Sequence, residues 1–250
     1  MDGSRKSNLG GQRRGILLAK AMNPKTVKLD PNEVIVQVSH QLPYRLASSE
    51  EGLFTLEPCY PSPSLLYANL DELAQNGTYK FVWVGIVVTK HPMTTFEEEQ
   101  ANKILLEKNS YAVFFTEEQI TPYLRFYEGL IRPNMHNFAD PSDHVKQALN
   151  YWAEFKSINS RIAWRVQEVR RQVNSHTVWI HGDQNMLVPY YIRQSEKVKA
   201  NIGFYFHQAF PASAIFQAFY KREELLQSLL HSDLIGFHIW EYARNFINSC

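Results

Sequence analysis

Runs of apolar, β-branched and aromatic residues alternate with segments of helical periodicity from about residue 33 onward. Buried strands are predicted at 34–40, 81–88, 111–115, 177–181, 202–207 and 234–238. These runs are almost continuously apolar, which is typical of strands covered on both faces of a sheet. Apolar residues at three- and four-residue spacing predict helices at 96–108, 151–173, 222–230 and 240–247.

Strand–helix alternation without an internal repeat predicts an α/β fold with a doubly wound, mostly parallel Rossmann-like sheet. Ligands of such sheets bind beyond the carboxyl ends of the strands. The positions of first interest are therefore His40–Gln41, Gly85–Ile86, His181–Asp183 and His207–Gln208. Residues 1–32 are polar and aperiodic, so we expect a disordered arm there and a domain at 33–250.

Charge adds little to this picture. The 250 residues include 26 Lys and Arg against 25 Asp and Glu, a net charge of +1, which excludes a polyanion-binding surface over the whole chain. The basic residues are concentrated in the first 28 positions, where Asp2 is the single acidic residue. A basic arm on a mildly acidic body is more typical of a solvated tail than of a nucleic-acid binder. We expect no nucleic-acid partner.

Several common sequence signals are missing. No apolar run has the length of a signal peptide or a membrane span, which predicts a cytoplasmic protein without membrane contact. The cysteines, Cys59 and Cys250, are too few for a disulfide framework, in keeping with a reducing compartment. The patterns GxxxxGK[ST], GxGxxG, HExxH, CxxC and DxDxT do not occur. We therefore expect no metal, no cofactor and no aspartyl-phosphate chemistry.

The strand ends carry motifs that resemble those of the trehalose-6-phosphate synthase family. Residues 178–189 read VWIHGDQNMLVP, against VWIHDYHLMLLP in the family, and residues 202–211 read IGFYFHQAFP, against IGFFLHxPFP. Residues 222–246 contain REELL, DLIGFH and YARNF, which resemble REELLxxLLxADLIGFHTxDYARHF. Residues 36–43 and 126–136 match VVVSNRLP and YxxxLWPLFH less closely. The shared order of these motifs over about 33–250 favours common family over chance.

This resemblance implies a retaining glycosyltransferase of two facing Rossmann-like domains. Such enzymes make trehalose 6-phosphate from UDP-glucose and glucose 6-phosphate, and their first domain binds mostly the acceptor sugar phosphate. The chain resembles an incomplete first domain, without the second, nucleotide-binding domain. We therefore expect weak binding of glucose 6-phosphate, a role for UDP-glucose only in a full-length context, and no glucosyl transfer by this chain alone.

The resemblance also assigns site residues. Tyr123, His181 and His207 match residues of the family's acceptor site. His207 matches a residue near the reacting sugar and is the candidate catalytic residue, while Tyr123 and His181 are candidate substrate-binding residues. Each has a plainer interpretation. Tyr123 is then an ordinary half-buried tyrosine, and His181 a structural histidine at a strand end. His207 then has no role, because a role for it requires a donor domain.

Other site positions depart from the family pattern. Gln41 stands where the family has an arginine that meets the sugar phosphate, and Gly182 stands where it has an aspartate that binds sugar hydroxyls. Asp183 is adjacent, but it would point to the other face if the strand continued. Arg132 replaces a tryptophan and is a candidate phosphate ligand, with an ordinary surface arginine as the alternative.

Two classes of function remain open from the sequence. The chain is either a synthase-like glycosyltransferase domain of trehalose biosynthesis or a non-catalytic regulatory or assembly module, like the synthase-like domains of regulatory subunits and phosphatase-type members. The C-terminal residues Phe237, Ile239, Trp240, Phe246 and Ile247 are strongly apolar. We therefore expect self-association or binding to another trehalose-synthesis subunit.

Overall fold

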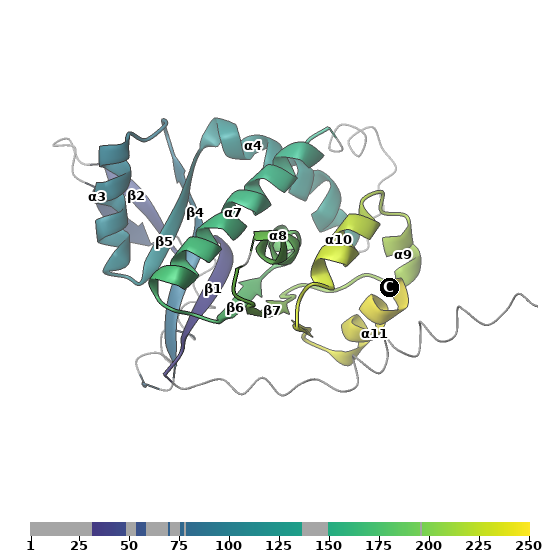
Figure 1. Cartoon of the computed structure of the whole chain (residues 1–250). Coiled ribbons are helices and arrows are strands. Elements are labelled where there is room, and N and C mark those ends of the chain that lie inside the picture. Colours follow the sequence, from purple (N-terminus) through teal and green to yellow (C-terminus); the bar gives the residue numbers. More distant parts are fainter. Residues whose placement is uncertain are drawn as a thin grey trace, which may run out of the picture. The chain divides into compact units, whose positions relative to one another are not determined.

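A parallel six-stranded sheet forms the centre of the computed structural model (Figure 1). Its strands are β1 (Val34–Gln41), β4 (Lys80–Thr89), β5 (Ser110–Thr116), β6 (Thr177–His181), β7 (Asn201–Tyr205) and β8 (Leu234–Gly236). They pair in the order β5-β4-β1-β6-β7-β8, and every pair is parallel. The order reverses between β1 and β6, as in the Rossmann arrangement. The predicted fold class is confirmed.

The structure describes residues 32–48, 54–58, 70, 76–77, 79–136, 150–195 and 197–250. The predicted disordered arm at 1–32 lies outside these residues, apart from Asn32. The elements described below all belong to one compact unit, Pro31–Cys250.

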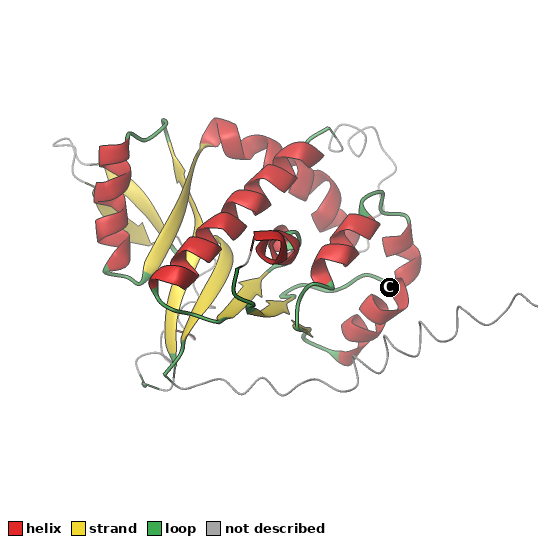
Figure 2. Ribbon diagram, in the orientation of Figure 1, coloured by secondary structure: helices red, strands yellow, loops and turns green. Residues whose placement is uncertain are grey.

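Helices cover the sheet on both faces (Figures 1 and 2). The larger core involves α4 (Glu117–Phe126), α7 (Trp152–Gln172), α8 (Val188–Ser195) and α10 (Arg222–Leu229). The smaller core involves α3 (Thr95–Leu106) and the hairpin of β2 (Tyr44–Ser48) and β3 (Phe54–Pro58). The remaining described elements are η1 (Tyr127–Ile131, a π-helix), α5 (Arg132–Met135), η2 (Asp183–Asn185), α9 (Ser213–Gln217) and α11 (Trp240–Ser249).

The strand β4 shows why its sequence is apolar at nearly every position. Val82, Val84 and Ile86 point into the larger core. Trp83 and Val87, at the alternate positions, belong to the smaller core on the opposite face. Since successive side chains of a strand point to opposite faces, a strand between two cores needs apolar residues throughout.

The long helix α7 begins and ends within a residue of its predicted bounds and crosses the larger core (Figure 1). Phe155, Ile162 and Val166 are fully buried along one side of it, whereas Trp164 is 63% exposed on another. Among the described helices, α7 included, none combines the length and the apolar character needed to cross a membrane.

Some boundaries differ from the sequence expectations. The predicted strands at 202–207 and 234–238 end early, at Tyr205 and Gly236, so His207 and His238 lie just beyond their strands. The hairpin β2–β3 and the helices α4, α8 and α9 were not predicted. The helix α4 begins with a capping box, in which Thr116 and Gln119 each bond the other's backbone N–H, a recognisable signal of a helix start.

A glycine in β4 brings the end of β1 close to its neighbour. A Cβ added at Gly85 would lie 2.9 Å from the backbone nitrogen of Leu42 and 3.1 Å from the carbonyl carbon of Gln41. Both neighbours are backbone atoms, which cannot rotate away. The absence of a side chain at Gly85 therefore sets the position of Gln41.

We predict that Gly85→Ala lowers the free energy of unfolding by about 1–3 kcal/mol, because overpacking forces the backbone to move. Urea denaturation followed by circular dichroism measures this change. The matched control is Gly77→Asn, since a Cβ at Gly77 meets nothing within 4 Å and asparagine tolerates its φ of +70°. Equal midpoints for Gly85→Ala and the unmodified chain would contradict the prediction.

Candidate functional site

Polar side chains gather at the carboxyl ends of the strands where the strand order reverses. His40 and Gln41 end β1, and His181 ends β6. His207 follows β7, and its Nε2 lies 2.9 Å from the Nδ1 of His181. We call this group the strand-end site; its members are Gln37, His40, Gln41, Tyr123, Tyr127, His181, Gly182, Asp183, Gln184, His207 and Gln208.

Tyr123 lies beneath the strand-end site and is fully buried. Its hydroxyl donates to the carbonyl oxygen of Gln184 at 3.2 Å and lies 3.1 Å from the Nδ1 of His40. Its ring stacks on the rings of His40 and Phe155. Tyr123 therefore contacts the end of β1 and the turn after β6, and its predicted contact with substrate stays a prediction.

The segment after β6 does not continue as a strand. Gly182 has a φ of +82°, a conformation that favours glycine, and the 3₁₀ turn η2 follows it. Asp183 was expected to face away from the site only if the strand continued, and the strand does not continue. Instead, Asp183 is 1% exposed and accepts a hydrogen bond from the Tyr127 hydroxyl at 3.2 Å. Gln208 in turn donates to the Tyr127 hydroxyl at 3.1 Å.

Burial controls the charge of this carboxyl group. It raises the pKa of Asp183 to about 6, although the hydrogen bond from Tyr127 works in the opposite direction. Burial and the Asp183 charge together raise the pKa of Tyr127, which keeps its proton and remains a donor. The hydrogen-bonded pair of Tyr127 and Asp183 thus joins the start of η1 to the turn after β6.

A buried asparagine of α7 holds the turn after β6 in place. The Nδ2 of Asn159 donates to the carbonyl oxygen of Gln184 at 3.3 Å, and its Oδ1 accepts from the backbone N–H of Leu187 at 3.2 Å. Asn185 donates to the carbonyl oxygen of His181 at 2.8 Å. These hydrogen bonds define the conformation of the turn after β6 and therefore the positions of Asp183 and Gln184.

The three histidines of the site are neutral at pH 7. Burial lowers the pKa of His40 to about 4. Burial of His181 lowers its pKa to about 3, and repulsion from His207 when that ring is protonated adds to the shift. Burial also lowers the pKa of His207, which is nevertheless the solvent-exposed member of the three. Because Gln41 is uncharged too, the described part of the strand-end site carries no positive charge.

Arg132 is the predicted site residue that lies apart from this group. It begins α5, its side chain is half exposed, and its Nη1 pairs with Glu128 Oε2 at 2.7 Å. It is near enough to the strand-end site for its charge to favour the ionised form of Asp183. The contacts are those of an ordinary surface arginine, and phosphate binding by Arg132 stays a prediction.

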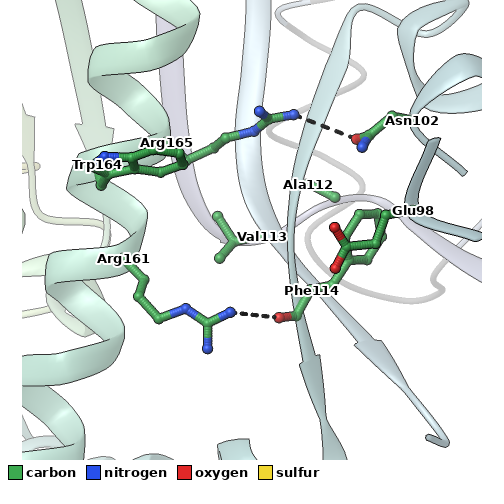
Figure 3. Close-up of a pocket in the computed structure, with 8 residues that line it drawn as sticks. All are labelled: Glu98, Asn102, Ala112, Val113, Phe114, Arg161, Trp164 and Arg165. Carbon is green, nitrogen blue, oxygen red and sulfur yellow. Dashed lines mark hydrogen bonds between the residues drawn. The ribbon is translucent and has the colours of Figure 1, made fainter. Parts of the chain in front are cut away.

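Two surface hollows lie away from the strand ends. One, of about 210 Å³, is bounded by α3, β5 and α7 (Figure 3). In it Arg161 donates to the carbonyl oxygen of Phe114 at 3.2 Å, and Arg165 donates to Asn102 Oδ1 at 3.4 Å. The other, of about 580 Å³, is lined by residues near the start of α10. Neither contains a residue that the sequence assigned to the site.

Sequence reasoning missed Gln37 and Tyr127. Gln37 is a polar residue within the apolar run of β1, and a buried amide needs a partner, so its position was a usable signal. Tyr127 follows Tyr123 by one helical turn and therefore shares its face. Within the described residues, no group of three or more His, Cys, Asp or Glu side chains is arranged to hold a metal ion.

A parallel sheet of Rossmann order, with polar residues gathered at its reversal point, defines the class: a Rossmann-like α/β domain. The pattern of glycosyltransferase family 20 matches residues 33–250, and the chain belongs to this family.

The most similar proteins include trehalose-phosphate synthases. One, alpha,alpha-trehalose-phosphate synthase [UDP-forming] 6 of Arabidopsis thaliana, is 30% identical over 94% of this chain and 29% of its own length. The N-terminal domain of Candida albicans trehalose-6-phosphate phosphatase has a TM-score of 0.67 at 23% identity, over 86% of this chain and 43% of that one.

A Burkholderia xenovorans synthase, solved with glucose 6-phosphate, has a TM-score of 0.58 at 19% identity and the same coverage, 86% and 43%. These structural likenesses show the fold. The chain spans less than half the length of each of these proteins. The family match and these likenesses thus support a trehalose-6-phosphate synthase-like domain in this chain.

The raised pKa of Asp183 makes a prediction for stability. As the pH rises from about 4 to about 6, the unfolded chain releases this proton before the folded chain does, so the carboxyl group progressively destabilises the fold. Asp183→Asn removes the effect. We expect the free energy of unfolding of the variant, relative to the unmodified chain, to rise by up to about 3 kcal/mol across this range.

Urea denaturation at several pH values between 4 and 7 measures this difference, in which the opposite contributions of His40 and His181 cancel. Tyr127→Phe is the companion variant. It removes the hydrogen bond that lowers the pKa of Asp183, so it should steepen the loss of stability with pH. A constant difference between Asp183→Asn and the unmodified chain at all pH values would contradict the assignment.

Proposed function

We propose that this chain is the acceptor-side domain of a trehalose-6-phosphate synthase-like protein, one that binds a sugar weakly and transfers no glucose by itself. The observation that carries the proposal is the composition of the strand-end site. Tyr123, His181 and His207 are kept and lie together, while Gln41 leaves the site without the cation that the family places at the sugar phosphate.

The chemistry of the accessible groups supports a ligand rich in hydroxyls. His207 is exposed, and Gln41 and Gln184 are partly exposed, so neutral polar residues meet the solvent there. Neutral polar groups of this kind pair well with alcohols and poorly with phosphate, for which Arg or Lys is the usual partner. The Burkholderia xenovorans relative was solved with glucose 6-phosphate, which makes that sugar the first ligand to test.

The composition of the strand-end site also supports the proposal that this chain transfers no glucose by itself. A transferase gains much of its rate from holding two reactants in a fixed geometry. In this chain two acceptor contacts of the family pattern, at Gln41 and Gly182, are altered, and Gly182 offers no side chain at all. An acceptor that is loosely held is poorly oriented for attack on a donor sugar.

We predict that glucose 6-phosphate binds the unmodified chain weakly and that Gln41→Arg tightens binding by about ten- to a hundredfold. The gain reflects a charge-assisted hydrogen bond to the phosphate, worth about 1.5–3 kcal/mol. Isothermal titration calorimetry with glucose 6-phosphate measures both affinities. Titration with glucose is the control, because an arginine that meets the phosphate should leave the affinity for glucose unchanged.

Arg132→Ala separates this mechanism from the alternative phosphate ligand. If Gln41 explains the weak binding, Arg132→Ala should have little effect on the affinity of the unmodified chain. Micromolar binding by the unmodified chain that Arg132→Ala abolishes would overturn the proposal and assign the phosphate contact to Arg132.

A second candidate function, assembly, is favoured by the apolar surface at the C-terminal end. Ile239 is 48% exposed, Trp240 76% and Ile247 41%. Phe246 turns inward and is 7% exposed, so of Ile239, Trp240, Phe246 and Ile247 three face solvent. They belong to α11 and the residue before it, and Leu234 of the edge strand β8 is also 43% exposed. An apolar patch next to a sheet edge is a typical site of protein–protein contact.

We predict that the chain self-associates through this patch, with a mass that rises with concentration in multi-angle light scattering. Trp240→Ser should shift the association to at least several-fold higher concentration, because it removes the largest exposed side chain of the patch. Trp164→Ser is the matched control, since Trp164 is 63% exposed but lies on α7. A monodisperse monomer at all concentrations would count against self-association, though not against binding to a different subunit.

A further inference from the structure

Three side chains form a continuous hydrogen-bonded row on one face of the sheet. Gln37 Oε1 lies 2.8 Å from His181 Nε2, and His181 Nδ1 lies 2.9 Å from His207 Nε2. The first two are buried, at 4% and 6% exposure, whereas His207 is exposed. The row therefore runs from the interior of β1, across the end of β6, to the solvent-facing residue after β7.

The chemistry of each group fixes the direction of the row. An amide oxygen only accepts, so the proton on His181 must reside on Nε2, where it is donated to Gln37. In a neutral imidazole the other nitrogen then accepts, so His181 Nδ1 takes a proton from His207 Nε2. His207 is then left with its Nδ1 unprotonated. Within the described residues, this nitrogen has no hydrogen-bond partner.

We propose that Gln37 is a positioning residue that fixes the tautomers of His181 and His207, so that His207 offers an unprotonated Nδ1 as hydrogen-bond acceptor at the strand-end site. The ligand group that it fits is a donor, namely a sugar hydroxyl, and not a phosphate oxygen. The assignment of the ligand rests on the proposed function; the assignment of the tautomers does not.

The surroundings of Gln37 hold its amide in one place. Gln37 is aligned with Trp83 of β4 and with Trp179 of β6, between two indole side chains on the same face. The ring of Trp83 also lies 6.2 Å from that of His181, between centroids. The position has Val in the family motif VVVSNRLP, so the acceptor that orients the two histidines is a feature of this chain.

Nuclear magnetic resonance tests the tautomers directly. In a chain labelled with ¹⁵N-histidine, two-bond ¹H–¹⁵N spectra at neutral pH distinguish a protonated Nε2 from a protonated Nδ1. His181→Asn and His207→Asn assign the two sets of peaks by their loss. We expect both histidines to show the pattern of a single tautomer with Nε2 protonated. A protonated Nδ1 on His207, or averaged signals, would overturn the proposal.

Variants of Gln37 test its part in the row. Gln37→Leu should abolish the single-tautomer pattern of both histidines, while Gln37→Glu, which keeps an accepting oxygen, should retain the proton on His181 Nε2. Gln208→Leu is the matched control, since this glutamine of the same site contacts Tyr127 and should leave both patterns unchanged. Unchanged patterns in Gln37→Leu would overturn the role of Gln37. If that variant does not fold, the unmodified chain and Gln37→Glu still decide the matter.

Addition of glucose 6-phosphate to the labelled chain tests the ligand. A hydroxyl that donates to His207 Nδ1 should shift that nitrogen's resonance upfield, and the Nε2 signal should stay protonated. Binding detected by calorimetry without this shift would overturn the hydroxyl contact. Absence of any binding would count against the proposed function, whereas the spectra of the ligand-free chain would still support or refute the positioning by Gln37.

Discussion

Desolvation of polar groups is the constraint on which the rest of the site depends. A buried donor or acceptor without a partner costs the fold about 1–3 kcal/mol, so each polar side chain placed at the junction of β1 and β6 requires another. Gln37 meets this need for His181, Tyr127 for Asp183, and Asn159 for the turn after β6. The reversal of strand order brings these groups together, and their mutual hydrogen bonds offset much of the cost of burying them.

Local pattern was sufficient to predict the main sheet, since runs such as 81–88 are apolar for the same reason that they are buried: each face of β4 meets a core. The same pattern placed His181 at the end of β6 and His207 near the end of the neighbouring β7, which ends two residues earlier. The course of the chain past His181 was not predictable, because it depends on the positive φ of Gly182 and on Asn159 in a distant helix. The helix α4 could have been found from its capping box.

The described residues of the strand-end site carry no positive charge, and their one carboxyl group, Asp183, is mostly ionised at pH 7 because its pKa is about 6. This charge distribution distinguishes the site from an ordinary anion site. Its histidines are kept uncharged by burial, and its one carboxyl group is held by a tyrosine that cannot ionise at physiological pH. The accessible layer is made of amides and an imidazole. In electrostatic terms the strand-end site favours uncharged ligands, while the apolar patch around Trp240 gives the same domain a separate means of contacting other proteins.

Gln41 and Gly182, two positions that differ from the family pattern, differ in how readily they would accept the side chain of that pattern. Gln41 follows a register shift in the pairing of β1 with β4, but its φ is not positive, so an arginine there meets no backbone restriction of the kind at Gly182. Gly182 has a backbone conformation that most residues avoid, and a Cβ there would lie 2.7 Å from Gln184 Oε1. The Gln184 side chain can move aside, but an aspartate at this position would still strain the backbone at a φ of +82°. Backbone geometry therefore restricts which residue can stand at position 182, whereas position 41 is open to a change of charge by substitution alone.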